Sequence, residues 1–224
     1  MSSTSAPRFS DRLFERAKPI WDAQVAHAFV RGIGDGTLPE ETFKRWVLQD
    51  YRYLIEFSRV FAYAAARADR LESMSWYAAV LNLTLNGEME LHRQYAARFG
   101  ISPAELEAVE MWPTTRAYTD FLVRVSASGD LADLVAALLP CAWGYVYIAA
   151  ILAEEMPAEP RYADWITQYT SPEFAEATDW LRLEMDRLAA GASPEKESEL
   201  TETFLLSSRY ELRFWDMCWT GETW

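Results

Sequence analysis

A proline and a cysteine stand side by side in the middle of a long apolar segment, at Pro140 and Cys141. A proline inside a helix removes one backbone hydrogen bond and displaces the carbonyl group four residues earlier. Tyr145 follows Cys141 by four residues, so the thiol and the phenol share one helix face and can line the same cavity. A thiolate in such a place is a candidate nucleophile. Free cysteines are more often small core residues, and on these residues alone that alternative stays open.

Two carboxyl residues lie on predicted helix faces that are otherwise aromatic. Asp50 shares a stripe with Trp46 and Tyr53 at three- and four-residue spacing. An unpaired buried carboxylate is costly, so Asp50 must be hydrogen-bonded or must serve a function. A hydrogen bond from a neighbouring Tyr or Arg side chain is the structural alternative. Glu211 repeats the pattern near the C-terminus, where it shares a helix face with Phe214.

The two histidines, His27 and His92, limit the metal chemistry that the chain can carry. A carboxylate di-iron bundle needs Glu-x-x-His twice, and the sequence does not contain that motif. Cys141 and Cys218 cannot form a disulfide framework and do not have metal-site spacing. Either histidine could ligate a haem iron, although a hydrogen-bonded structural histidine is the more common case. Because phosphate-binding and dinucleotide motifs are also absent, we expect neither a metal nor a cofactor.

Helical apolar spacing runs through nearly the whole chain, whereas strand-like alternation and fixed repeats do not occur. Serine before proline at Ser102, Ser171 and Ser193 marks three helix starts. The sequence predicts an all-α, single-domain helical bundle over residues 1–224, with residues 1–10 as a frayed polar tail. The predicted helices span Asp11–Arg31, Pro39–Arg67, Leu71–Phe99, a short helix from Pro103, Thr114–Ser128, Asp130–Glu155, Arg161–Tyr169, Pro172–Ala190 and Pro194–Trp219.

The segment Leu134–Ala153 is uncharged over 20 residues, which is the length of a membrane span. Its flanking charges are all acidic, so no basic residues are present to orient it in a bilayer. Pro140 and Gly144 also interrupt it. A helix that is apolar on all sides is typical of the centre of a globular core, and that is the structure we predict.

The charge balance excludes several classes of partner. The 224 residues include 34 Asp and Glu against 21 Lys and Arg, which gives a net charge of −13. Nucleic-acid binding and docking on an anionic membrane both require clustered basic residues. The polar N-terminus does not have the apolar core of a signal peptide, so we expect a cytoplasmic protein.

Three segments together resemble the TenA-like thiaminase II family of aminopyrimidine aminohydrolases, in its cysteine-containing branch. They are the stretch from Trp21 through HAFVRGIGDGTLPEETFKRWVLQDYRYL at 27–54, LLPCAWGYVYIA at 138–149, and SRYELRFWDMCW at 208–219. They occur in the order and spacing of the family, so the resemblance covers nearly the whole chain. It implies the haem-oxygenase-like helical fold without haem, usually assembled as a homotetramer.

The resemblance also implies an activity and a set of site residues. The reaction is hydrolysis of 4-amino-5-aminomethyl-2-methylpyrimidine to the hydroxymethyl pyrimidine used for thiamine salvage, with slower thiamine cleavage in many members. By the family pattern, Cys141 is the nucleophile that adds to the ring, and Glu211 is the acid and base. Asp50 holds the aminopyrimidine edge. The residues that match the family's substrate pocket are Tyr53, Tyr118, Tyr145, Tyr169 and Phe214.

Three other functions stay open at this point. The first is a haem-binding or haem-degrading protein of the same fold, and the second is a non-enzymatic regulator. The third is an aminohydrolase that acts on a different pyrimidine or a related amine with the same residues. The net charge of −13 weighs against direct contact with DNA.

Overall fold

The computed structural model describes residues 7–224, and within that range the regular secondary structure is entirely helical. This confirms the predicted all-α fold. The helices, in chain order, are α1 (Phe9–Val25), α2 (Ala28–Gly34), α3 (Glu40–Arg67), α4 (Leu71–Leu83), the π-helical turn η1 (Thr84–Glu88), α5 (Met89–Arg98), α6 (Pro103–Glu107), α7 (Pro113–Ser128), α8 (Leu131–Leu152), α9 (Pro160–Tyr169), α10 (Pro172–Leu188) and α11 (Pro194–Thr220).

The single helix predicted over 11–31 is wrong, because His27 divides it into α1 and α2. The His27 backbone is extended, and its Nδ1 accepts a hydrogen bond of 3.1 Å from the backbone N–H of Phe29. This contact caps the N-terminus of α2. At the other end of α1, Phe9 and Ser10 are helical and buried, and the Ser10 N–H donates to Asp186 at 2.7 Å. The tail predicted over 1–10 is therefore wrong for these two residues, while residues 1–6 lie outside the described part of the chain.

The helix predicted over 71–99 is also interrupted. The π-helical turn η1 separates α4 from α5 and ends at Glu88. A π-helical turn inserts an extra residue into the helix and shifts the faces that follow it, and such turns are frequent at functional sites. Helical periodicity alone does not indicate where this extra residue falls.

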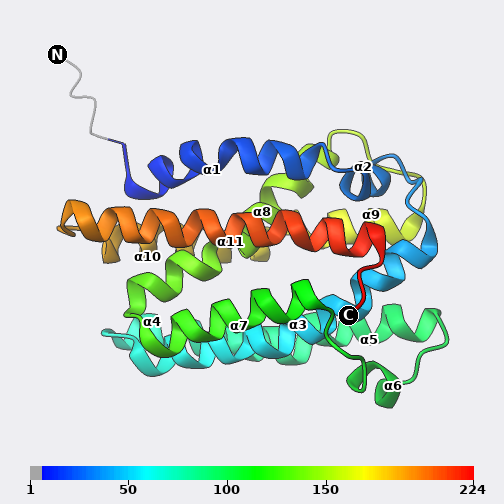
Figure 1. Ribbon diagram of the computed structural model, residues 1–224, viewed down its shortest axis with the longest axis horizontal. Coiled ribbons are helices and arrows are strands. Elements are labelled where there is room, and N and C mark those ends of the chain that lie inside the picture. Colours follow the sequence, from blue (N-terminus) through cyan, green and yellow to red (C-terminus); the bar gives the residue numbers. More distant parts are fainter. Residues whose placement is uncertain (1–6) are drawn as a thin grey trace.

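The apolar helix α8 crosses the middle of the molecule, as Figure 1 shows. It packs on α11 and α10 on one side and on α3 and α7 on the other. It is long and apolar enough to span a membrane, but most of it is buried by the other helices. This confirms the expected core helix, which also continues through Pro140.

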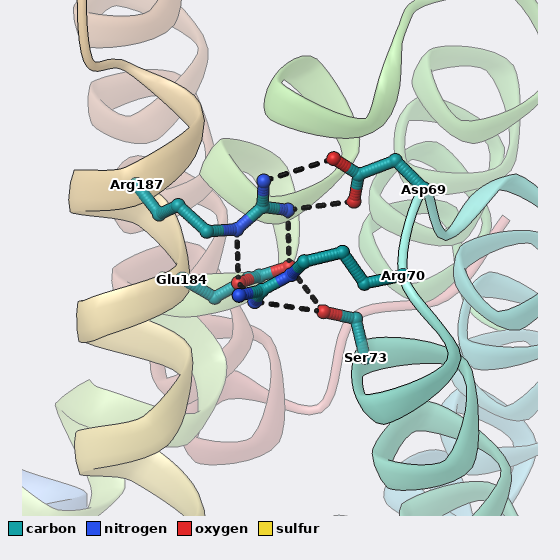
Figure 2. A network of polar contacts seen from close by, with 5 residues as sticks. All are labelled: Asp69, Arg70, Ser73, Glu184 and Arg187. Atoms are coloured by element: carbon teal, nitrogen blue, oxygen red, sulfur yellow. Dashed lines mark hydrogen bonds and ion pairs between the residues drawn. The ribbon is translucent and has the colours of Figure 1, made fainter.

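A charged network joins the start of α4 to α10, as Figure 2 shows. Arg187 donates to both carboxylate oxygens of Asp69 at 2.8 and 2.9 Å and also to Glu184 at 2.8 Å. Arg70 and Ser73 donate to the same Glu184 carboxylate at 2.9 and 3.0 Å. We call these five residues the α4–α10 network, and it ties together two helices that also form one end of the cavity described next.

Candidate active site

A cavity of about 370 Å³ lies between α3, α4, η1, α8, α9 and α10. The cavity extends along α3 and therefore has two ends. Asp50 and Tyr53 line one end, and Phe61 lies two to three turns further along the helix, at the other end. The polar end is lined by Asp50, Tyr53, Glu88, Cys141, Tyr145 and Tyr169. The apolar end is lined by Phe57, Phe61, Trp76, Val80, Leu83, Phe174, Ala177, Thr178 and Leu181. The cavity falls at the lower end of the range of small-molecule sites, about 300–1,000 Å³.

Cys141 reaches the cavity from α8 and is partly exposed to it, one helical turn before Tyr145. The two side chains therefore line the same cavity, as their spacing predicts. Burial raises the pKa of the Cys141 thiol well above its usual range, and the charge of Glu211 raises it further. The Tyr53 hydroxyl opposes both effects. The resting side chain is therefore a neutral thiol that must lose its proton when it reacts.

Glu211 lies on α11 behind Cys141 rather than in the cavity wall, and only 3 % of it is exposed. The Tyr118 hydroxyl donates to Glu211 Oε1 at 2.5 Å and lies 3.1 Å from the Ser207 hydroxyl. Burial raises the pKa of Glu211 to about 8, against the lowering effects of Tyr118 and Cys141. A carboxyl group with this pKa can both donate and accept a proton near neutral pH, as an acid–base catalyst must.

Asp50 pairs with His92 of α5, whose Nε2 lies 2.7 Å from Asp50 Oδ2. The partner is thus a histidine and not the Tyr or Arg that the sequence suggested. His92 Nδ1 lies 2.9 Å from the carbonyl oxygen of Glu88, which can only accept, so Nδ1 carries a proton. Nε2 faces the Asp50 carboxylate. Burial lowers the pKa of His92. The hydrogen bonds and charges of Asp50 and Glu88 raise it by more, so the net pKa is above the usual value for histidine.

Each histidine makes at least one hydrogen bond through its ring, as the sequence favoured. His92 has acceptors at both ring nitrogens. His27 caps α2 through Nδ1, and its Nε2 lies 3.0 Å from Asp216. Neither histidine presents a free nitrogen to a haem iron. Within residues 7–224, the structure contains no group of three His, Cys, Asp or Glu side chains placed to hold a metal.

The five predicted aromatic residues gather at the polar end in two layers. Tyr53, Tyr145 and Tyr169 line the cavity, with the rings of Tyr145 and Tyr169 4.7 Å apart. The second layer lies behind Tyr53. There the Tyr118 ring is 5.1 Å and the Phe214 ring 6.0 Å from that of Tyr53. Tyr118 and Phe214 therefore support the wall rather than form it.

Glu88 is a cavity residue that the sequence did not predict. Its carboxylate accepts a hydrogen bond of 3.2 Å from the Tyr169 hydroxyl, and η1 places it in the wall. Burial and the charge of Asp50 raise the pKa of Glu88 to about 7, while His92 and Tyr169 lower it. The sequence feature that could have predicted Glu88 is its four-residue spacing from His92, because this spacing places both residues near one helix face.

Comparisons with known proteins cover the whole of this site. Residues 14–221 match the TENA/THI-4/PQQC family. The aminopyrimidine aminohydrolase of Halalkalibacterium halodurans is 44% identical over 219 residues, which cover 96% of this chain and 97% of that protein. A solved structure described as a TenA family transcription regulator, from Silicibacter sp. TM1040, superposes with a TM-score of 0.89 at 34% identity and covers 98% of this chain and 100% of its own.

A more distant solved structure identifies the fold. It is a domain of unknown function with a heme oxygenase-like fold from Shewanella denitrificans, with a TM-score of 0.73 at 14% identity, covering 94% of this chain and 92% of its own. The fold is therefore haem-oxygenase-like, as the resemblance implied. The family match extends from α1 to the end of α11 and includes every residue of the site. This chain belongs to the TENA/THI-4/PQQC family.

Proposed function

We propose that this protein is an aminopyrimidine aminohydrolase that serves thiamine salvage. It hydrolyses 4-amino-5-aminomethyl-2-methylpyrimidine to the hydroxymethyl pyrimidine and ammonia. The observation that carries the proposal is one cavity in which an accessible thiol, Cys141, meets the Asp50 carboxylate and three tyrosines, with Glu211 behind the thiol. The 44% identical relative that is named an aminopyrimidine aminohydrolase supports the same activity.

The polar end of the cavity suits a flat, neutral heteroaromatic ring. Tyrosine rings supply apolar faces for stacking, and their hydroxyl groups supply directional hydrogen bonds without net charge. Among the residues that the structure describes, the wall of the cavity contains three acidic residues, Asp50, Glu88 and Glu173, and neither Lys nor Arg. Because one oxygen of Asp50 faces His92, its other oxygen can accept a hydrogen bond from the ring's amino group.

The reaction starts when the Cys141 sulfur adds to a ring carbon. An S–C bond forms, the thiol proton passes to the ionised form of Glu211, and the displaced electron pair moves onto a ring nitrogen. That nitrogen takes a proton from the Asp50–His92 pair, and the 2.7 Å contact between Asp50 Oδ2 and His92 Nε2 supports this role. Glu211 then gives its proton to the departing amine as the C–N bond breaks, and an electron pair from the ring forms a double bond between the ring carbon and the methylene carbon.

The second half of the reaction reverses these transfers. Water adds to the methylene carbon and gives a proton to Glu211. The S–C bond breaks, the ring nitrogen returns its proton to Asp50, and the thiolate leaves. Cys141 takes back its proton from Glu211, so the enzyme ends in its starting state. The net change is one water consumed and one ammonia released.

Ammonia release from the aminomethyl pyrimidine tests the proposal. We expect Cys141→Ala to abolish turnover and to leave binding of the hydroxymethyl product within a few-fold of wild type. Cys218→Ala is the matched control, because Cys218 is fully buried in α11 and does not line the cavity. It should retain turnover. Full activity in Cys141→Ala would contradict the mechanism, and lack of ammonia release by the wild-type protein from this substrate would contradict the function.

Thiamine cleavage is a second candidate activity, and the apolar end of the cavity supports it. This end extends beyond the tyrosines and has space for a larger leaving group. Ala177→Leu would narrow that space from α10 without changing the polar end. We expect it to slow thiamine cleavage more than release of ammonia. Equal effects on both substrates would contradict a role for the apolar end.

We also propose that the protein forms a homo-oligomer. Four apolar side chains of the segment from α4 to η1 are exposed, namely Leu71, Met74, Leu83 and Leu85. Two of them, Leu71 and Met74, are three residues apart on α4, and exposed apolar side chains that lie together are typical of protein–protein contacts. Light scattering on the purified protein should give the mass of a tetramer, and the mass of a monomer would contradict the proposal.

A further inference from the structure

Tyr169 and Glu88 meet at the wall of the cavity, and the polar groups of both can be reached from inside it. The phenol hydroxyl of Tyr169 donates to Glu88 Oε1 at 3.2 Å. A phenol has one hydrogen to donate, so a hydroxyl that gives it to a carboxylate can offer a ligand only its lone pairs. A protonated Glu88 reverses this arrangement. Its carboxyl hydrogen then points to the phenol oxygen, and the phenol hydrogen is free to face the cavity.

We propose that Glu88 sets whether the Tyr169 hydroxyl donates or accepts inside the cavity, and thereby acts as a positioning residue for a ring nitrogen of the bound pyrimidine. This inference rests on the proposed function, because it needs an aromatic ring whose nitrogen accepts a hydrogen bond. An unprotonated ring nitrogen is an acceptor, so it is bound well only when Tyr169 donates. The protonated form of Glu88 is thus the binding form.

The surroundings of Glu88 favour a change of protonation in the working range of the protein. The charge of Asp50 of α3 raises the pKa of Glu88, and His92 of α5 lowers it. From α8 and α9 it is faced by neutral groups, Cys141 and Tyr169. Glu173 of α10 lines the same cavity. The balance of burial and these charges places the pKa of Glu88 at about 7.

Affinity for the hydroxymethyl pyrimidine, measured by calorimetry between pH 6 and 8.5, tests the proposal. This ligand is chosen because its side chain does not titrate. In Glu88→Gln, the amide N–H donates to the phenol oxygen at every pH and so imitates the protonated carboxyl group. Comparing the two proteins at each pH removes the titration of the ring itself. At pH 6 we expect similar affinities, and at pH 8.5 we expect the wild type to bind about 3- to 10-fold more weakly than the variant, the worth of one hydrogen bond.

Tyr169→Phe provides an independent measurement if Glu88→Gln folds poorly. It lacks the hydroxyl, so it should bind about 3- to 10-fold more weakly than wild type at pH 6 and nearly equally at pH 8.5. In the Tyr169→Phe background, Glu88→Gln should have no pH-dependent effect. Affinity ratios that do not change with pH would overturn the inference while leaving the proposed function intact. Absence of pyrimidine binding by the wild type at every pH would overturn the proposed function and this inference with it.

Discussion

Glu184 in the α4–α10 network and Glu211 behind Cys141 each have 3 % of their surface exposed, yet their pKa values shift in opposite directions. Burial alone raises the pKa of both residues. At Glu184, hydrogen bonds from Arg187 and Ser73 and the charge of Arg70 outweigh burial, so the net pKa is lowered (Figure 2). At Glu211 the hydrogen-bonding groups are a phenol and a thiol, and the pKa rises to about 8.

The comparison shows that cationic hydrogen-bond donors can outweigh the effect of burial on a carboxyl group, as at Glu184, whereas Glu211 is more deeply enclosed, has no such donor and keeps a raised pKa. Within residues 7–224, the wall of the cavity contains neither Lys nor Arg, and the nearby His92 is paired with Asp50. Glu211 and Glu88 are therefore left to exchange protons near neutral pH. A carboxyl group that is hydrogen-bonded to two arginines stays ionised, whereas one without a cation can gain and lose a proton near neutral pH.

The largest effect should come from removing the exchangeable proton of Glu211. We expect Glu211→Gln to lower kcat for ammonia release by about 10²- to 10⁴-fold, the usual worth of a general acid–base. Glutamine keeps the shape of the side chain and can still accept the Tyr118 hydrogen bond. Steady-state assays at pH 7 measure the effect, with product affinity as the check that the cavity is intact. A kcat within threefold of wild type would show that Glu211 is not the acid–base.

The same substitution should increase the free energy of unfolding relative to wild type, and this difference should grow as the pH rises. The folded state keeps the Glu211 proton up to about pH 8, whereas the unfolded chain releases it near the ordinary Glu pKa of 4.5. In the wild type, stability contributed by this group is complete below that pKa and falls as pH rises towards 8. Glu211→Gln should thus match wild type near pH 5 and exceed it by about 2–4 kcal/mol at pH 8.

Denaturant unfolding at several pH values between 5 and 8.5 measures this difference. Glu176→Gln is the matched control, because Glu176 lies on the exposed surface of α10. It should differ from wild type by a constant amount across the range. A Glu211→Gln variant that is less stable than wild type at pH 8 would show that Glu211 is ionised and paired in the folded protein.

Local spacing was enough to predict the parts of the fold and site that depend on single helices. Cys141 and Tyr145 share a cavity because four residues are one helical turn. The burial of α8 follows from a segment that is apolar on every face. The serine and proline pairs at Ser171 and Ser193 mark helix starts because they satisfy local backbone groups.

The features that the sequence did not predict depend on contacts between distant segments or on one displaced residue. The Asp50–His92 pair joins α3 to α5, and helical periodicity does not specify such a pairing. The π-helical turn before Glu88 changes which face the carboxyl group occupies, so the residue could not be placed in a cavity. The His27 cap divides a helix at a residue type that is uncommon as a cap.

The smallest effect should come from the structural side of the comparison, where Glu184→Gln removes a charge from the α4–α10 network. We expect a loss of about 1–3 kcal/mol at pH 7, below the value for a fully buried pair because Arg70 and Arg187 reach solvent. The stability that Glu184 contributes changes with pH in the opposite direction to that of Glu211. Because the folded pKa of Glu184 is lowered, its stabilisation is complete above the unfolded pKa and disappears as pH falls through the folded pKa. The deficit of Glu184→Gln in denaturant unfolding should therefore shrink in acid while kcat at pH 7 stays at the wild-type value. A deficit that grows in acid, or a kcat that falls with it, would mean that Glu184 and Glu211 differ in something other than their cationic partners.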